Sequence, residues 1–294
     1  MITKYALSLL AIILIGAGCS SDNAIGPNSG ATDTNLAINE IDNPGAIAES
    51  FFDGHHGLHR EMTFVVRIEN VSTASSLELS NGETAPVPHA PGVWTISRFP
   101  NTIFTAGRYD RDKGLEELAE DGNPARLAAS LMANKYIESS GVFNTPVGDA
   151  NPGPALPGKA YEFTVTASPG DRLSFATMFV QSNDLFYAPN GNGIPLFLRN
   201  RQPISGDVTR FIKLWDAGTE VNQEPGLGSD QAPRQSSPNT GETEHKRIYQ
   251  IRNHRFLSLL SRDQFSYPST EEIIKVTITP MEETSSPEEF SQEG

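Results

Sequence analysis

Two strand patterns follow one another in the segment YEFTVTASPGDRLSFATMFV, residues 161–180. In residues 161–167 apolar side chains alternate with polar ones, and this two-residue period is typical of a strand with one buried face. Residues 173–180 are almost continuously apolar and are bounded on both sides by turn-forming residues. The second pattern predicts a central strand that is covered on both faces.

Short apolar runs of the same kind recur along the chain, separated by many of its 21 prolines and 25 glycines. They predict further strands at 62–69, 93–98, 194–198, 208–214, 248–251 and 273–279. Helices are minor: one is expected at 114–120, and a second after Asn123-Pro124, which resembles an N-cap followed by proline at the first helical position. The sequence therefore predicts an all-β fold, an antiparallel β-sandwich with short helices on its connections.

The N-terminus has the features of an export signal. Residues 1–18 contain Lys4, an apolar stretch and three small residues, and the apolar stretch is shorter than the ~20 residues that span a bilayer. The small residues directly before Cys19 resemble the bacterial lipobox, although Gly16 stands where that motif usually has leucine. The resemblance implies that residues 1–18 are removed and that Cys19 is lipidated. The alternative is an ordinary secretory signal that leaves Cys19 as a free thiol.

Lipidation of Cys19 would place the chain in the bacterial cell envelope, because two acyl chains anchor a protein firmly to a membrane. Ser20 follows the cysteine where some inner-membrane lipoproteins have a retention aspartate, and the outer membrane is therefore preferred. Cys19 is the only cysteine, so no intramolecular disulfide is possible.

Composition divides the rest of the chain into an ordered body and two polar ends. Residues 19–57 are rich in Ser, Asn, Asp, Gly and Pro and are expected to be a disordered tether, as is the acidic tail at 282–294. The folded domain is predicted to cover 58–281. Within it, 222–244 is expected to be a long loop, since Gly, Pro, Ser, Gln and Asn dominate its composition.

The net charge of −14 argues against nucleic acid as a partner, because cationic side chains provide most of the affinity for phosphate backbones. Closely spaced carboxylates can instead bind divalent cations.

Three acidic residues follow predicted strands. Asp184 comes directly after the apolar run, and Asp216 and Glu220 lie in WDAGTE, residues 215–220. Gly218 allows a sharp turn, so that two carboxylates four residues apart can approach one point. Together the three would suit calcium, which binds six to eight oxygen ligands in irregular geometry. The simpler interpretation is that these residues are solvated turn formers.

Several of these segments resemble the spondin N-terminal domain family. WDAGTE at 215–220 is similar to the family's WDAGTD, and SNDLF at 182–186 is similar to its SPDWF. Residues 114–122 end in LAEDG and resemble a segment that ends in LAExG, and residues 170–174 resemble the sequence before the family's central strand. The order is preserved, and the resemblance covers roughly residues 60–280.

The resemblance implies an antiparallel β-sandwich with a calcium ion at one edge, held by Asp184, Asp216 and Glu220. Glu220 replaces an aspartate and reaches one methylene further, while Asn183 replaces proline and Leu185 replaces tryptophan. A site of altered geometry is therefore expected. Animal relatives belong to the extracellular matrix, so the resemblance implies adhesion to, or binding of, an extracellular or envelope protein or glycan.

Three functions remain open on the sequence. The first is a calcium-holding binding module without enzymatic activity. The second is a calcium-dependent envelope hydrolase, for which no histidine in the motifs around Asp184 or Asp216 offers a general acid or base. Glu117, Glu120 and Asp121 could supply a carboxylate pair for glycoside hydrolysis, but side chains on so short a helix are normally a solvated face. The resemblance instead makes Glu120 a marker of local conformation. The third function is a purely structural lipoprotein.

A separate cluster of histidines, His55, His56 and His59, could bind a transition metal, but a surface histidine patch is the better interpretation. The sequence contains neither the Gly-x-Ser-x-Gly motif of hydrolases nor a phosphate-binding glycine loop.

Overall fold

The computed structural model describes residues 61–252 and 265–281. The expected signal peptide, the lipidation site Cys19, the tether, the histidine cluster and the acidic tail lie outside the described residues. Within the described ranges no helix has the length and apolar character that a membrane-spanning helix requires.

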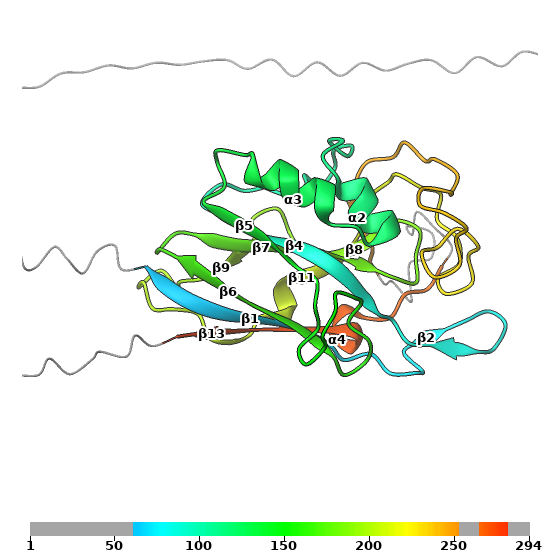
Figure 1. Ribbon diagram of the computed structural model, residues 1–294, viewed down its shortest axis with the longest axis horizontal. Coiled ribbons are helices and arrows are strands. Elements are labelled where there is room, and N and C mark those ends of the chain that lie inside the picture. The colour runs from blue at the N-terminus through cyan, green and yellow to red at the C-terminus, as the bar shows by residue number, and fades with distance from the viewer. Residues whose placement is uncertain (1–60, 253–264, 282–294) are drawn as a thin grey trace, which may run out of the picture. The chain divides into compact units, whose positions relative to one another are not determined.

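The described chain forms two antiparallel sheets that lie as two layers (Figure 1). The smaller sheet has the order β10 (Gly206–Asp207), β13 (Ile274–Pro280), β1 (Met62–Asn70) and β6 (Ala160–Ala167). The larger has the order β12 (Tyr249–Gln250), β11 (Ile212–Asp216), β8 (Leu185–Pro189), β7 (Arg172–Phe179), β4 (His89–Ser97) and β5 (Ser139–Phe143), with β9 (Ile194–Pro195) pairing with β7. A separate hairpin joins β2 (Leu77–Glu78) to β3 (Thr84–Ala85). The predicted all-β antiparallel sandwich is confirmed.

The main core lies between the two sheets. Strand β1 buries Phe64, Val66 and Ile68 completely, as its alternating sequence predicts, and β7 contributes Leu173 and Phe175 from the opposite layer. Complete burial of a large apolar side chain contributes about 1.5–3 kcal/mol, so this core accounts for much of the stability of the sandwich.

Two helices cover the outer face of the larger sheet, α2 (Leu115–Asp121) and α3 (Ala125–Met132) (Figure 1). Leu118 of α2 packs there with Ala176 of β7 and with Phe186 and Trp215 of the neighbouring strands. Strand β7 is therefore covered on both faces, and this explains the nearly continuous apolar sequence of residues 173–180. Both helices lie where the sequence predicts them.

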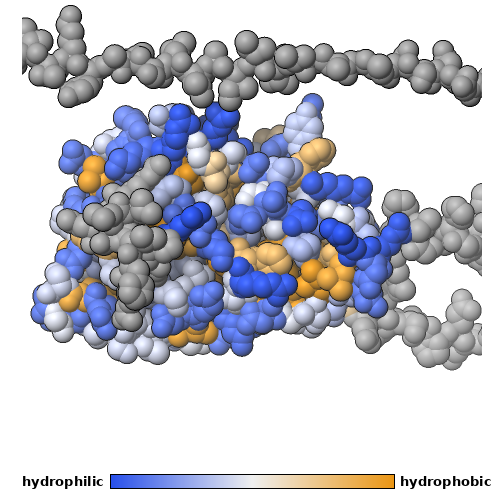
Figure 2. Space-filling model, turned by 180° about the vertical axis from the view of Figure 1, so that it is seen from behind, coloured by the Kyte–Doolittle hydropathy of each residue, from blue (hydrophilic) through white to orange (hydrophobic). Residues whose placement is uncertain are grey.

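The remaining elements are short. Two lie around β11 and β13: the 3-10 helix η1 (Thr209–Phe211) and the helix α4 (Thr270–Ile273), which begins with a capping box formed by Ser269 and Glu272. The strand predicted at 208–214 is partly wrong, because η1 precedes β11, and the strand predicted at 194–198 forms only at Ile194–Pro195. The face shown in Figure 2 is largely hydrophilic, with apolar residues in small separate clusters.

Candidate metal centre

The pairing of β8 with β11 brings the two acidic turns together. Asp184 immediately precedes β8, and Asp216 is the last residue of β11, where it pairs with Leu185. The N–H of Ala217 donates a hydrogen bond of 3.1 Å to the carbonyl oxygen of Asp184. Two segments about 30 residues apart in sequence therefore meet at one end of the larger sheet, as the sequence analysis expected.

Gly218 makes the turn after β11 possible. Its φ of +71° lies in the left-handed region, and a Cβ at this position would lie 2.6 Å from the carbonyl oxygen of Lys246. Any larger residue would strain the backbone and clash with the neighbouring segment. The turn directs residues 219 and 220 back toward Asp184.

The side chain of Asp184 is fully buried and interacts with this turn through one of its two carboxylate oxygens. Its Oδ2 accepts the backbone N–H of Thr219 at 2.8 Å and that of Glu220 at 3.2 Å. The Thr219 hydroxyl donates to the same oxygen at 3.3 Å. Oδ1 of Asp184 is buried and has no hydrogen-bond partner in the part of the chain that the structure describes.

The other two predicted ligands are also buried and accept hydrogen bonds from nearby loops. Asp216 accepts the N–H of Gly218 at 2.7 Å and the side-chain amide of Asn222 at 2.6 Å. Glu220 accepts the side-chain amide of Asn183 at 3.2 Å and the N–H of Gly241 at 2.9 Å. Asn183, which replaces the proline of the resembling family, thus acts as a donor to Glu220.

The loop at 222–244 provides several of these donors. It contains no helix or strand, but it is held by side-chain hydrogen bonds. The fully buried Gln231 donates to the carbonyl of Glu224 at 2.8 Å, and the guanidinium of Arg234 donates to Gln181 at 3.2 Å. The composition of the loop predicts a segment without stable structure. Hydrogen bonds to residues far away in the sequence nevertheless hold it against the acidic turns.

A fourth buried carboxylate belongs to helix α2. Glu120 is 2% exposed, and neither of its oxygens has a well-formed hydrogen bond among the described residues. From the sequence, Glu120 is expected to mark the local conformation of the helix or to lie on its solvent-exposed face. The glycine that follows the helix could have indicated its burial: a Cβ at Gly122 would lie 2.6 Å from the Ala90 side chain, so the end of α2 is pressed against the larger sheet.

Burial makes all four carboxyl groups harder to ionise. It raises the pKa of Asp184 well above its ordinary value, and the neighbouring Asp216 raises the pKa of Asp184 further. Burial also raises the pKa of Asp216 to about 6, that of Glu120 to about 8, and that of Glu220. None of these four residues takes part in any ion pair found between described side chains.

The arrangement is a cluster of buried acids and not a formed metal site. Throughout 61–252 and 265–281, no three Asp, Glu, His or Cys side chains converge in a geometry that could hold an ion. The donor chemistry nevertheless fits a hard cation, since the oxygens of Asp184 and Glu120 that lack partners are buried and are not balanced by a basic side chain. Binding would require the carboxylates to turn from their loop donors toward a common point.

Two of the three other acids of α2 have different contacts. Glu117 forms an ion pair with Arg126, and Asp121 accepts the side-chain amide of Gln235 at 2.9 Å and the N–H of Asn239 at 3.3 Å. These contacts hold α2, α3 and the 222–244 loop together.

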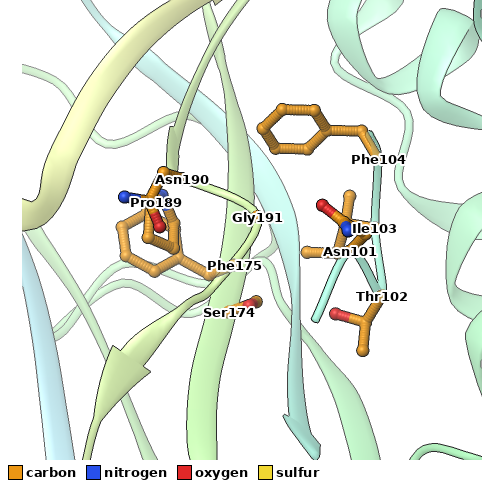
Figure 3. Close-up of a pocket in the computed structure, with 9 residues that line it drawn as sticks. All are labelled: Asn101, Thr102, Ile103, Phe104, Ser174, Phe175, Pro189, Asn190 and Gly191. Atoms are coloured by element: carbon orange, nitrogen blue, oxygen red, sulfur yellow. The ribbon is translucent and has the colours of Figure 1, made fainter. Parts of the chain in front are cut away.

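A small pocket lies elsewhere, where the segment at 101–104 crosses β7 and the end of β8 (Figure 3). Its volume is about 10 Å³, room for about one water molecule. Its lining residues carry no ionisable side chain: Asn101, Thr102, Ile103, Phe104, Ser174, Phe175, Pro189, Asn190 and Gly191. The acidic cluster is therefore the better candidate for a functional site.

Comparisons of the chain with models of known protein families and with curated proteins gave no match.

Proposed function

We propose that this chain is a calcium-holding binding module of the spondin type, without enzymatic activity, in which Asp184, Asp216 and Glu220 are ligands of the ion. The observation that carries the proposal is the buried Oδ1 of Asp184, which lies beside a second buried acid. Among the described residues this oxygen has no hydrogen-bond partner, and no basic side chain balances either acid. An isolated buried charge is costly, and a bound cation would remove that cost.

Calcium suits these residues better than a transition metal does. All the donors are oxygens, and the neighbouring loops offer backbone carbonyls that could complete six to eight ligands. The longer reach of Glu220 is compatible with the irregular geometry that calcium accepts. The ion would link the turn before β8 to the turn after β11 and would order both.

The ordered loops would then present a surface to a partner, an extracellular or envelope protein or a glycan. The lipobox-like sequence before Cys19 supports display from a bacterial membrane through a lipid anchor, with the outer membrane preferred. The resemblance of residues 182–186 and 215–220 to the spondin family supports a binding role over the hydrolase alternative. His89 gives no support to a hydrolase, because it is buried in the core and contacts the carbonyl oxygen of Ile273.

Thermal unfolding of the full chain, purified in detergent, tests the calcium site. Calcium at about a hundred times its dissociation constant should raise the melting temperature by about 5–10 °C, since it binds the folded state alone. Asp216→Asn should abolish the rise. Asp207→Asn is the matched control, because Asp207 is also a strand-end aspartate that accepts a backbone N–H, from Thr209 at 2.8 Å, but it belongs to the other sheet.

Absence of any calcium-dependent rise in the unmodified chain at millimolar calcium would overturn the proposal. An equal rise in the Asp216→Asn variant would remove Asp216 from the site.

A further inference from the structure

Glu120 is the buried acid with the fewest compensating contacts. Both of its carboxylate oxygens are buried and lack a well-formed hydrogen bond, whereas the three predicted ligands each accept at least two. A buried carboxylate in this state is unfavourable in either ionisation state, because both its charge and its hydrogen-bonding groups are removed from water. A partner that contacted these oxygens would therefore lower the free energy of the folded state.

The surroundings of Glu120 place it beside the acidic turns. It interacts electrostatically with Glu220 and with Asp184, and the Thr219 side chain lies next to it. The Thr219 hydroxyl lies between the two acids: it donates to Asp184 Oδ2 at 3.3 Å and is also within reach of the Glu120 carboxylate. One hydroxyl proton cannot satisfy both acids, so at least one Glu120 oxygen keeps no partner among the described residues.

The other acids of the helix do not share this state. Glu117 is paired with Arg126, and Asp121 accepts two hydrogen bonds from the 222–244 loop. Glu116 is half-buried at the start of the helix, one turn before Glu120. Only Glu120 combines nearly complete burial with a position beside Asp184 and Glu220.

We propose that Glu120 is a fourth carboxylate ligand of the cation, which joins helix α2 to the ends of β8 and β11. This inference rests on the proposed function, and it adds a ligand from a third segment of the chain. Because α2 packs on β7 and β8, the ion would fix the helix to the sheet at its C-terminal end. Calcium should then slow amide hydrogen exchange in residues 115–121 as well as in the two turns.

The test is calorimetric titration with calcium and hydrogen exchange, both on the full chain in detergent. Glu120→Gln keeps the size of the side chain and removes its charge. We expect it to weaken calcium binding about tenfold or more, because the charge of the ligand set controls calcium affinity, and to abolish the calcium-dependent protection of 115–121. Glu120→Asp, which keeps the charge on a shorter side chain, should bind calcium more tightly than Glu120→Gln.

Glu116→Gln is the matched control, since it removes one negative charge from the same helix at a half-buried position. It should change the calcium affinity less than about threefold, the effect of a nearby charge that is not a ligand. Without calcium, Glu120→Gln should melt at the same temperature as the unmodified chain or higher, because burial raises the pKa of Glu120 and glutamine avoids the cost of protonating this acid in the folded state. This result would show that the variant folds.

The outcomes separate the two proposals. If the unmodified chain binds calcium and Glu120→Gln binds it equally well, the fourth ligand is refuted and the proposed function stands. If Glu120→Gln lowers the melting temperature without altering calcium affinity, Glu120 has only a packing role. If the unmodified chain binds no calcium, the proposed function fails and this inference fails with it.

Discussion

Single buried residues set how this domain responds to acid, and His89 is the clearest case. Its Nε2 lies 3.3 Å from the carbonyl oxygen of Ile273, and its ring packs edge-on against Tyr187 at 5.6 Å. Complete burial lowers the pKa of His89 to about 4. The folded protein therefore holds this histidine neutral over a pH range in which the unfolded chain protonates it.

Acidification from pH 6.5 to 4 should consequently remove the part of the free energy of unfolding that His89 contributes, whereas the buried acids with raised pKa values, Asp184, Asp216, Glu120 and Glu220, gain stability as the pH falls. In this window the unfolded state binds the proton of His89 and the folded state does not, so the contribution of His89 is lost as the pH falls. The contribution of His89 is up to about 3 kcal/mol. Denaturant unfolding at pH 7, 5.5 and 4 should show that the free energy of unfolding of His89→Phe, which keeps an aromatic ring, falls less or rises more on acidification than that of the unmodified chain. An identical pH dependence in the variant would show that His89 is not responsible.

At the scale of single residues, the sequence predicts where the acids of the candidate site lie along the chain, but not how they are buried or where their oxygens point. The positions of Asp184, Asp216 and Glu220 at strand ends were predictable, because alternation and turn residues define where strands stop. The direction in which their oxygens point was not predictable, since it depends on donors such as Asn222 and Gly241 from a segment with no regular pattern. Glu120 was missed because an acid on a short helix is usually exposed.

At the scale of elements, long periodic strands were predictable, whereas the shortest strands were predicted at too great a length, as β9 and β12 were, or missed, as β10 was. The alternation in β1 and β6 and the apolar run of β7 follow directly from one-sided and two-sided burial. The two-residue strands β9, β10 and β12 depend on pairing with neighbours rather than on their own sequence. Local patterns carry no information about such pairing.

The order of the 222–244 loop was likewise not predictable from its local sequence. Its order comes from contacts with residues far away in the sequence, among them Gln181 and Asp121. Hydrogen bonds of the buried Gln231 amide and of the exposed Arg234 guanidinium replace the apolar core that its composition lacks. A Pro- and Gly-rich stretch can therefore be held in place by polar side chains together with backbone hydrogen bonds, such as that from Gly226 to Gln181.

At the scale of the whole molecule, the net charge of −14 and the acidic cluster favour binding of cations over binding of anionic polymers. The predicted lipid anchor would keep such a domain at a membrane surface. We therefore propose, from the resemblance to spondin domains, the proposed calcium site and the predicted anchor, a module that binds a partner outside the cytoplasm.

The anchor can be tested by growing a bacterial host that expresses the full chain with labelled palmitate. Label should be incorporated into the unmodified chain and should be absent from Cys19→Ala, because acylation requires the thiol. An unmodified chain without label, or label that persists in Cys19→Ala, would contradict lipidation of Cys19.

The most direct test of the central claim is the calcium content of the full chain after equilibrium dialysis against millimolar calcium, measured by elemental analysis. We expect one calcium ion per chain, and none in Asp184→Asn, since Asp184 has a buried carboxylate oxygen without a hydrogen-bond partner among the described residues. An unmodified chain that retains no calcium would contradict the claim, and so would an Asp184→Asn variant that retains as much as the unmodified chain.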